Sequence, residues 1–595
     1  MVLTSLIPKV DERKIAILTA LGKVKADLVI KSTSLVNVYS EEIIENVDIA
    51  IKGRLIARIG KCDDVIGPET LVIDGTKYYT TPGFIDAHIH IESSFLTPTK
   101  FVKAVLPHGT TTVFADPHEI GNVLGVEGVK EFIRECSELP IKILITVPSC
   151  IPACKFGLET SPNRFTVKDI DELLSIDNTA CLGELMDDLG ILSTDEELLK
   201  EVEVTMLKGL KVCGHAPGLR ANELNAYLIS GANSDHEVVT AEDALEKIRL
   251  GMYVMVRLGT FSNDLYRIIR HIPPSMYGMV MLVSDDLNVH DILTRGHLDY
   301  IASEAVKLGL DPVRVLKMIT LTPAQYYGLD HIIGSVGPGK IADIVMLKDL
   351  RDMIVDKVIC NGKLLVDHGK LVITLKEYEY PEKFVKTVKI PEITIEKFKV
   401  KTDLEEGEVK VRVIGIEEGT LITKHLIEKL PVEKREVKLS NNIAKVAVIE
   451  RHGISGNCSV GFVKNFPISE GAVAATISHD THNLTVIGTN DNDMYLAVKT
   501  MAEIGGGLVL TSKGEVKAKV DLPVAGLMSF EEPEVVNDKI LRFLSEWEKI
   551  GGKYSIKALA PMFLLSLVVI PELRITDKGL VDVHQGKIVN LIVSD

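Results

Sequence analysis

Short apolar runs alternate with amphipathic stretches through the middle of this chain. The apolar runs are rich in β-branched residues, which is the pattern of strands. The stretches between them, for example 195–207, 240–250 and 297–309, have the periodicity of helices with one buried face. Alternation of strand and helix favours a parallel sheet. The candidate strands lie at 83–90, 109–115, 142–148, 180–184, 210–215, 230–236, 252–257 and 279–284. Eight such units over about 250 residues predict an α/β fold of the (β/α)₈ barrel type.

Both flanks of this region are β-rich. Strands are predicted within 26–30 and 48–60, with a turn at Lys52-Gly53 and a helix at 11–21 before them. Residues 334–347 return to a strand pattern after the barrel. The stretch 375–400 is rich in Lys, Glu, Tyr and Pro and is typical of a linker, and a third unit of alternating strands and helices follows it. We therefore expect four segments, at 1–80, 81–332, 333–385 and 400–595.

Composition narrows the classes of protein. A chain of 595 residues with 46% hydrophobic and 25% charged residues is typical of a globular protein of two to four domains. The net charge of -16, with no dense Lys/Arg block, argues against a nucleic-acid partner. No window reaches the roughly 18 apolar residues of a membrane span, and residues 1–9 do not resemble a secretory signal. Eight scattered cysteines do not form a disulfide framework, so we expect a reduced, cytoplasmic compartment.

The first barrel strand carries a pair of histidines. It begins after a turn signal, Pro82-Gly83, and ends in His88-Ile89-His90. Side chains two apart on a strand point to the same face, so the two imidazoles project together and can chelate one metal ion. Alternatively, the two histidines are ordinary polar residues at the end of a strand. The neighbouring carboxylates Asp86 and Glu92 favour the metal site.

Other strand ends carry the same kind of residue. A single His or Asp at a strand end is usually a hydrogen-bonded structural residue. Here, ligand-type residues follow in the order His-x-His, Glu, His, His, Asp at the strand ends where barrels carry their chemistry, and this series predicts a metal centre. A mixed imidazole and carboxylate set suits Zn, Mn and Fe. The segments are Asp116-Pro117-His118-Glu119, Gly183-Glu184, Gly214-His215, Ser234-Asp235-His236-Glu237 and Ser284-Asp285-Asp286.

These motifs resemble the amidohydrolase superfamily of metal-dependent barrel hydrolases and, within it, the adenine deaminase family. The resemblance covers nearly the whole chain, and its most specific segments are 82–94, 116–120, 182–186, 214–217 and 234–237. It implies a barrel flanked by a composite β-sandwich, to which residues before and after the barrel contribute, and a C-terminal α+β domain characteristic of the family.

The resemblance also implies a site with two divalent metal ions, Mn or Fe before Zn. One ion would be held by His88, His90 and Asp285, and the other by His215 and His236. Glu184 would bridge them, where many superfamily members use a carbamylated lysine. The implied reaction is hydrolytic deamination of adenine to hypoxanthine and ammonia by a metal-bound hydroxide. The family further suggests a homo-oligomer of two or more copies.

Proton transfer and substrate contacts are implied for a second set of residues. Asp285 would take a proton from the nucleophile and deliver one to the leaving amine. Glu92, His118 and Glu119 are candidates for protonating the purine ring and holding its edge, and the sequence does not rank them. Arg257 is a candidate substrate contact at the end of the seventh strand.

One departure leaves an alternative substrate open. The family pattern Arg-Glu-Gly-Ser is Arg257-Leu258-Gly259-Thr260 here, so a carboxylate is lost. Either this change is tolerated, or the substrate is another aminopurine or a cyclic amide. A barrel kept only for binding is disfavoured, because all the expected ligands are present.

A different class of zinc deaminases carries His-x-Glu and Pro-Cys-x-x-Cys. The chain has His90-Ile91-Glu92, but Cys150 and Cys154 are separated by three residues, so that class is rejected and these cysteines are interpreted as small buried residues.

The C-terminal unit contains one strongly polar cluster, Ser478-His479-Asp480-Thr481-His482-Asn483. The histidines at 479 and 482 could bind metal, but we favour a polar turn between two strands, which could also lie over the barrel mouth and help to close it. The amphipathic stretch 533–550 predicts a helix in which Trp547 packs against the core.

Overall fold

The computed structural model describes residues 3–153, 157–417, 420, 422–440 and 442–593. Its centre is a parallel sheet of eight strands that pair in sequence order. All eight predicted strands are present, although the sixth is short. They are β6 (Phe84–Ile89), β7 (Thr110–Ala115), β8 (Lys142–Val147), β9 (Thr179–Leu185), β10 (Lys211–Gly214), β11 (Ser234–Asp235), β12 (Tyr253–Arg257) and β13 (Val280–Val283).

The sheet closes into a barrel at the carboxyl ends of β6 and β13. Ile89 and Asp285 form a parallel bridge, the Asp285 N–H donates to the His88 carbonyl at 3.1 Å, and the His90 N–H donates to the Asp285 carbonyl at 3.4 Å. The predicted barrel is confirmed. Its closing hydrogen bonds lie among the predicted metal ligands, so the contacts that close the barrel also position the site.

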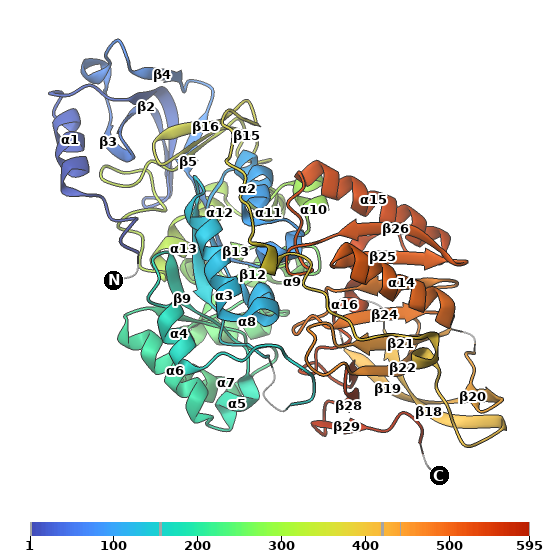
Figure 1. Cartoon of the computed structure of the whole chain (residues 1–595). Coiled ribbons are helices and arrows are strands. Elements are labelled where there is room, and N and C mark those ends of the chain that lie inside the picture. The colour runs from blue at the N-terminus through green and yellow to red at the C-terminus, as the bar shows by residue number, and fades with distance from the viewer. Residues whose placement is uncertain (1–2, 154–156, 418–419, 421, 441, 594–595) are drawn as a thin grey trace.

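Helices cover the outside of the barrel (Figure 1). The three predicted as examples are present, and two begin with side-chain caps: Asp195 accepts from the Leu198 N–H at 3.0 Å, and Thr240 accepts from the Asp243 N–H at 3.2 Å. The main barrel helices are α2 (Pro98–Val105), α3 (His118–Ser137), α4 (Val167–Leu173), α6 (Glu196–Leu207), α7 (Ala221–Ile229), α8 (Ala241–Arg249), α10 (Val289–Arg295), α11 (Leu298–Lys307), α12 (Pro312–Met318) and α13 (Leu321–Tyr326).

A second sheet joins the two flanks of the barrel. Strand β14 pairs antiparallel with β5, with Ile344 opposite Pro82, as the resemblance implied for the segment after the barrel. Figure 1 shows this blue and yellow sheet beside the barrel. The nine strands are β1 (Leu28–Asn37), β2 (Glu42–Lys52), β3 (Leu55–Ile59), β4 (Leu71–Asp74), β5 (Tyr79–Pro82), β14 (Ile344–Leu347), β15 (Val355–Cys360), β16 (Lys363–Asp367) and β17 (Lys370–Leu371), and α1 (Val10–Ala20) packs beside β3.

The Pro-Gly pair before the first barrel strand is a junction rather than a reverse turn. Pro82 ends β5, and Gly83 alone connects it to β6. A Cβ at Gly83 would lie 2.1 Å from the Thr111 hydroxyl, so only glycine fits between the flanking sheet and the barrel. The flanking sheet therefore fixes the start of the strand that carries His88 and His90.

The C-terminal region is built on a third sheet of nine strands, which are mainly antiparallel. They are β18 (Glu406–Ile416), β19 (Thr423–Glu433), β20 (Glu436–Val437), β21 (Ile443–Ile449), β22 (Cys458–Lys464), β23 (Ala472–Ala475), β24 (Leu484–Gly488), β25 (Gly507–Ser512) and β26 (Glu515–Asp521). A separate hairpin sheet follows, with β27 (Leu573–Thr576), β28 (Gly579–Asp582) and β29 (Lys587–Val589).

Two long helices, α14 (Asp491–Ile504) and α15 (Pro533–Lys549), pack on the third sheet. The buried Trp547 on α15 lies 5.6 Å from the Phe466 ring, measured between centroids, so its predicted packing role is confirmed. Helix α15 also contacts α2 and α10 of the barrel, which brings the C-terminal region against the barrel mouth (Figure 1).

The stretch 375–400 has two short 3₁₀ helices, Glu382–Phe384 and Ile395–Phe398, and is otherwise irregular. It packs along the barrel: the Tyr378 hydroxyl donates to Glu131 at 2.6 Å, and Tyr380 donates to Glu135, both on α3.

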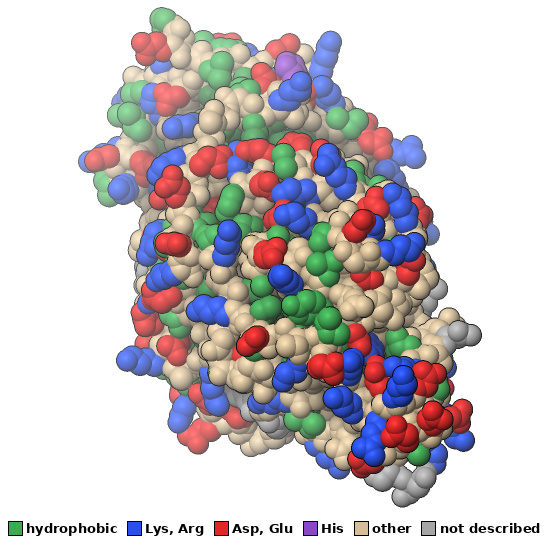
Figure 2. Space-filling model, turned by 45° about the vertical axis from the view of Figure 1, so that its right-hand side comes forward, with side chains coloured by type: hydrophobic (Ala, Val, Ile, Leu, Met, Phe, Trp, Pro, Cys, Tyr) green, Lys and Arg blue, Asp and Glu red, His purple; other side chains and the backbone are tan. Residues whose placement is uncertain are grey.

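Over the face shown in Figure 2, side chains of both charge signs are interspersed. Among the described residues, no helix has the length and apolar character needed to cross a membrane.

Candidate active site

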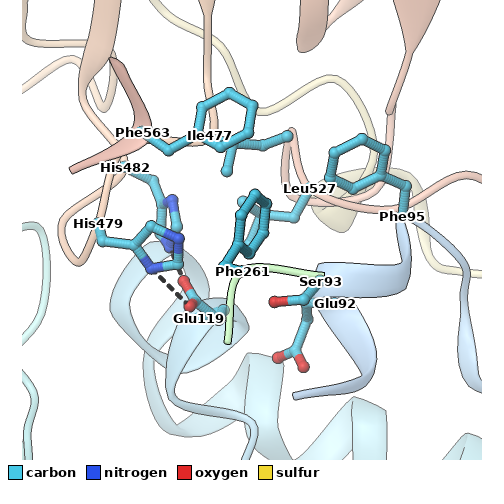
Figure 3. Close-up of a pocket in the computed structure, with 10 residues that line it drawn as sticks. All are labelled: Glu92, Ser93, Phe95, Glu119, Phe261, Ile477, His479, His482, Leu527 and Phe563. Atoms are coloured by element: carbon cyan, nitrogen blue, oxygen red, sulfur yellow. Dashed lines mark hydrogen bonds and ion pairs between the residues drawn. The ribbon is translucent and has the colours of Figure 1, made fainter. Parts of the chain in front are cut away.

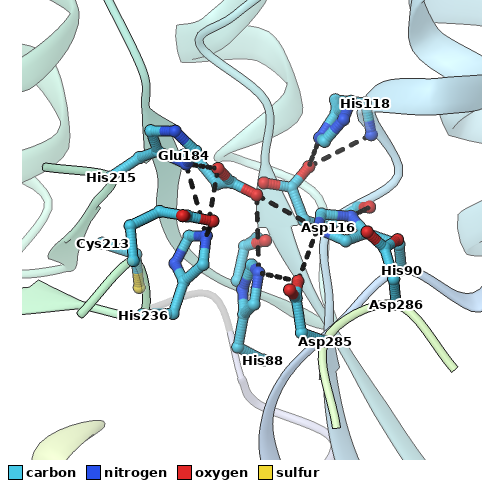
Figure 4. Close-up of polar contacts among 12 residues, drawn as sticks. His88, His90, Asp116, His118, Glu184, Cys213, His215, His236, Asp285 and Asp286 are labelled. Carbon is cyan, nitrogen blue, oxygen red and sulfur yellow. Dashed lines mark hydrogen bonds and ion pairs between the residues drawn. The ribbon is translucent and has the colours of Figure 1, made fainter. Parts of the chain in front are cut away.

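Six side chains from five strand ends converge inside the barrel mouth (Figure 4). Five of them are buried, and only the His215 side chain keeps a partly exposed edge. Because the carboxyl ends of parallel strands lie at one end of a barrel, residues far apart in the sequence meet there. The structure brings together all the predicted metal ligands: His88, His90, Glu184, His215, His236 and Asp285.

Glu184 lies in the middle of this group and faces a different histidine pair with each oxygen. Its Oε1 is 3.4 Å from His88 Nε2 and 3.1 Å from His90 Nε2. Its Oε2 is 2.5 Å from His215 Nδ1 and 3.3 Å from His236 Nε2. One carboxylate can therefore serve two adjacent cation positions.

Asp285 completes the first of these positions. Its Oδ1 lies 3.3 Å from His88 Nε2 and 3.4 Å from His90 Nε2, on the side opposite to the second histidine pair. Separations of about 3 Å between ligand atoms are those expected around an ion with metal–ligand distances near 2 Å. His88, His90, Asp285 and one Glu184 oxygen thus outline one coordination sphere.

The chemistry of the donor set fits divalent cations. His88 Nε2 is buried and has no hydrogen-bond partner among the described residues, and His215 Nδ1 lies 3.3 Å from His236 Nε2. Burial by itself lowers the pKa of His88, but the Asp285 and Glu184 carboxylates raise it to about 10. Burial raises the pKa of Glu184, but His236 and His215 lower it well below its usual range. The electrostatic potential of the two carboxylates, Asp285 and Glu184, therefore stabilises positive charge at this site.

A buried polar chain holds the two barrel strands that close at the site. The Ser284 hydroxyl donates to Asp86 Oδ2 at 2.5 Å, and the His88 N–H points to Asp86 Oδ1 at 3.4 Å. His297 Nε2 lies 3.1 Å from Asp86 Oδ2, and its Nδ1 lies 2.7 Å from the Thr110 hydroxyl. Asp86 thus positions ligand-bearing residues on both β6 and β13. Sequence analysis noted Asp86 as a neighbour but gave it no role.

A second buried group positions the other histidine pair. Lys247 donates to Asp235 Oδ2 at 2.7 Å, to Asp243 Oδ2 at 3.1 Å and to the Ala216 carbonyl at 2.8 Å. Asp235 Oδ1 accepts from the Ala216 N–H at 2.8 Å, so it ties the residue after His215 to the residue before His236. Burial raises the pKa of Asp235, but Lys247 lowers it below its usual value. Sequence reasoning missed Lys247, because nothing local links it to the strand ends.

Arg257, predicted to contact substrate, lies among carboxylates. Its guanidinium donates to Asp264 Oδ2 at 3.0 Å and to Asp285 Oδ2 at 3.1 Å, and it also pairs with Glu237. It does not line the pocket described below. Its neighbour Leu258, the departure from the family pattern, lines a different small cavity with Leu287 and His297.

A pocket opens beside the ligands, between the barrel and the C-terminal region (Figure 3). It encloses about 340 Å³ of space, counting the part open to solvent. None of the six predicted ligands lines it, but Glu92 and Glu119 do. Aromatic and aliphatic side chains form most of its remaining wall, as is typical of small-molecule pockets. They are Phe95, Phe261, Ile477, Leu527 and Phe563.

The three predicted ring-contacting residues lie next to one another. His118 stands between the ligands and the pocket: its ring is 4.6 Å from that of His90, and its Nε2 is 3.3 Å from Glu119 Oε1. Glu92 Oε1 accepts from the Ile120 N–H at 3.2 Å, while its buried Oε2 has no hydrogen-bond partner among the described residues. Burial, with a further contribution from Glu119, raises the pKa of Glu92 to about 7.

The polar cluster of the C-terminal region also reaches this pocket. It connects β23 to β24, as the predicted turn between strands requires, and it lies over the barrel mouth, where His479 and His482 contact Glu119. Its composition signalled a polar turn, but the partner across the fold was not visible in the sequence. Cys150 is buried, as interpreted, and Cys154 falls outside the described residues.

Family models match most of the barrel and C-terminal regions. The amidohydrolase family model covers residues 79–365. This match, on a barrel with imidazole and carboxylate side chains gathered at its strand ends, defines the chain as an amidohydrolase. The model of the adenine deaminase C-terminal domain covers residues 420–587.

Full-length relatives define the family more narrowly. The adenine deaminase of Staphylothermus marinus is 43% identical over 98% of both chains. The adenine deaminase of Moorella thermoacetica is 40% identical over 98% of this chain and 99% of its own length. That of Thermosipho melanesiensis is 41% identical over 96% of this chain and 98% of its own length. The chain belongs to the adenine deaminase family. A solved molinate hydrolase structure aligns with 57% of this chain and 94% of its own, at 17% identity and a TM-score of 0.43.

Proposed function

We propose that this protein hydrolyses adenine to hypoxanthine and ammonia at a site with two divalent metal ions. The observation that carries the proposal is the Glu184 carboxylate, which faces one histidine pair with each oxygen, in a chain 43% identical to an adenine deaminase over nearly its full length. The pocket beside it has apolar walls and a few polar groups, which suits a purine.

The residues that would hold the ions are those of the two histidine pairs and the two carboxylates. One ion would be held by His88, His90 and Asp285, and the other by His215 and His236. Glu184 would contact both ions. We propose Mn or Fe, with Zn also compatible with this mixed donor set. Bound divalent ions would lower the pKa of a water molecule toward neutrality and so supply a hydroxide nucleophile for C6 of the purine.

Asp285 is placed to move a proton at the reacting centre. Its Oδ2 accepts from Arg257, and its Oδ1 lies among the histidines. Burial raises the pKa of Asp285, but His88, His90 and Arg257 lower it well below its usual range, so the side chain is a carboxylate. We assign it acceptance of the nucleophile's proton and delivery to the departing amine. Arg257 then acts by orienting Asp285.

Glu92 is the best placed of the three candidates to protonate the ring. It lines the pocket, and its Oε2 is buried without a partner among the described residues. Glu119 is hydrogen-bonded to His482 and ion-paired with His479, which favours its ionised form, so it suits an accepting role at an N–H edge of the substrate. His118 bridges these groups and the ligands. The structure therefore supports a ranking that the sequence left open.

The family and the cysteines support two further expectations. The seven cysteines that the structure describes are unpaired, which supports a cytoplasmic location. We also infer an assembly of two or more copies, which light scattering of the purified protein would measure.

The test is ammonia release from adenine by protein reconstituted with Mn(II) or Fe(II), beside an Asp285→Asn variant. We expect turnover that depends on metal and falls by a factor of about 10² or more in the variant. Turnover that survives metal removal, or that the variant retains, would contradict the mechanism. No reaction with adenine, but ammonia from another aminopurine or hydrolysis of a cyclic amide, would reassign the substrate.

A further inference from the structure

The loop between β23 and β24 forms one wall of the candidate pocket (Figure 3). Its Ile477, His479 and His482 face the barrel residues Glu92 and Glu119 across the pocket. His479 Nδ1 lies 2.8 Å from Glu119 Oε1, and His482 Nε2 contacts Glu119 Oε2. Both carboxylate oxygens of a barrel residue are therefore held by the C-terminal region.

This loop is fixed from both sides. The fully buried Arg451 donates to the His482 carbonyl and, at 2.9 Å, to the Ala525 carbonyl. Asn483 donates to the Thr160 carbonyl of the barrel at 3.0 Å. A buried guanidinium and a hydrogen bond to the barrel define the position of the loop. The side chains of its histidines are therefore held in place at the pocket.

The hydrogen bonds define the tautomer of His482. The Ser478 N–H donates to His482 Nδ1 at 3.2 Å, so Nδ1 carries a lone pair. The ring proton is then on Nε2, which donates to Glu119. Burial lowers the pKa of His482 to about 4, in agreement with a neutral ring. An Nε2 that bears a proton cannot ligate a metal, so His482 is a hydrogen-bond donor to Glu119 rather than a metal ligand.

His479 has a different environment. Its Nδ1 is used by Glu119, and no partner of its Nε2 is found among the described residues. Its side chain lines the pocket and is 15% exposed. Burial lowers the pKa of His479, but Glu119 raises it to about 9, so both ring nitrogens carry protons near neutral pH. One ring nitrogen is thus paired with Glu119, and the other is available to a molecule in the pocket.

We propose that His479, from the C-terminal region, contacts the substrate and donates a hydrogen bond from Nε2 to an acceptor nitrogen of the purine ring. Glu119 and His482 position it. This inference rests on the proposed function, because a purine offers ring nitrogens as acceptors, whereas the apolar walls supply the stacking surface. The barrel alone then lacks one of the groups that select the substrate.

The variants His479→Asn and His479→Gln separate the two nitrogens. An Asn amide lies near the position of Nδ1 and can keep the Glu119 contact, whereas a Gln amide lies near that of Nε2 and can restore the donor in the pocket. The ligands are adenine and its 1-deaza, 3-deaza and 7-deaza analogues, each of which lacks one acceptor nitrogen. Because metal-loaded protein turns over adenine, the KM and kcat would be measured for adenine, and the affinity for each deaza analogue would be measured as its inhibition constant against adenine turnover.

We expect His479→Asn to weaken adenine binding by about 10- to 100-fold, as for loss of a charge-assisted hydrogen bond, and to change kcat by less than about 3-fold. One deaza analogue should bind wild type more weakly than adenine does, and this difference should disappear in His479→Asn. The difference should partly return in His479→Gln. If a deaza analogue binds more weakly because it loses a contact with Glu92 or another residue, that loss of affinity should remain in both variants.

The control is His425→Asn, because His425 pairs with Asp582 at 3.4 Å in the same region but does not line the pocket. Metal content and thermal midpoints of all variants would be compared. If wild type deaminates adenine and both His479 variants bind the four ligands as wild type does, only this inference is overturned. If wild type binds no purine, the proposed function and the inference both fail.

Discussion

Single side chains at this site take their roles from what surrounds them. Glu92, Glu119 and Glu184 are all glutamates within the same barrel mouth, but each has a different environment. Glu184 faces four imidazoles, and Glu119 is held by two histidines of another region. Glu92 is buried, and its Oε2 has no hydrogen-bond partner in the described part of the chain. Residue type alone predicted that all three belong to the site, and burial with specific partners distinguishes them.

The bridging role of Glu184 can be tested by the variant Glu184→Gln. The amide keeps the size of the side chain but replaces one charged oxygen with an NH₂ group, which does not ligate a metal. We expect a loss of at least one of the two bound ions and a fall in kcat of about 10² or more. Metal content by plasma mass spectrometry and ammonia release would measure both.

Glu246→Gln is the matched control, because Glu246 lies on α8 and pairs with Arg220 at the surface. It should retain full metal content. Two ions and normal turnover in Glu184→Gln would show that this carboxylate does not bridge.

Among the elements, the ends of β10 and β11 depend on a helix that supplies a buried cation. Lys247, on α8, is completely buried and holds Asp235 between the two strand ends. A buried ion pair is weak support for net stability, but its rupture leaves an uncompensated charge. Here it also supports the backbone on which His215 and His236 are mounted.

The variant Lys247→Met removes the buried ammonium and leaves the Asp235 and Asp243 carboxylates without their cation. We expect the free energy of unfolding to fall by about 3–5 kcal/mol, and metal affinity to fall by about 10- to 100-fold. Denaturant unfolding and metal titration would measure these effects. The double variant Lys247→Met, Asp235→Asn should recover part of the stability, because only the Asp243 carboxylate then remains without its cation. If the single variant is as stable as wild type, the pair has no structural role.

At the scale of the whole molecule, the barrel and the C-terminal region share one buried polar surface. Besides Glu119, the barrel contributes Glu159, whose carboxylate accepts from the Thr481 hydroxyl at 2.8 Å. Asp577 accepts from Thr160, and α15 packs against α2 and α10. Because Glu119 and its two histidine partners line the candidate pocket, docking of the two regions and formation of the pocket are coupled.

Glu159 makes this docking dependent on pH. Burial raises the pKa of Glu159 to about 8, and the nearby Asp480 and Asp577 act in the same direction. The folded protein therefore binds a proton that the unfolded chain releases above its ordinary pKa of 4.5, so this group's contribution to stability declines as pH rises from about 4.5 to 8. Glu159→Gln, which stays neutral, should raise the thermal midpoint at pH 9 more than at pH 5.

Thermal unfolding of both proteins at the two pH values would measure this difference. With about 1.4 kcal/mol per pKa unit, the effect is a few kcal/mol at most. An equal shift of the midpoint at both pH values would exclude titration of Glu159 as its cause.

Much of the architecture could be predicted from local pattern. Each barrel strand is a short apolar run, so β6 to β13 were predicted correctly. The six ligand-type residues at the strand ends lie together in the structure, and their role as metal ligands stays a prediction. The prediction was least accurate for β11, because the strand contains only Ser234 and Asp235 of the predicted residues 230–236. A strand this short has too few residues for its periodicity to mark its start.

Sequence alone determined the class of fold, the order of the elements and the chemical identity of the candidate ligands, because periodicity and strand-end residues are local properties. Tertiary structure decided which groups meet. His482 and Glu119 are 363 positions apart, and Lys247 reaches Asp235 from a helix that reads as an ordinary surface element. Protonation states and the pocket wall depend on burial and on partners across the fold, and neither leaves a periodic trace in the chain.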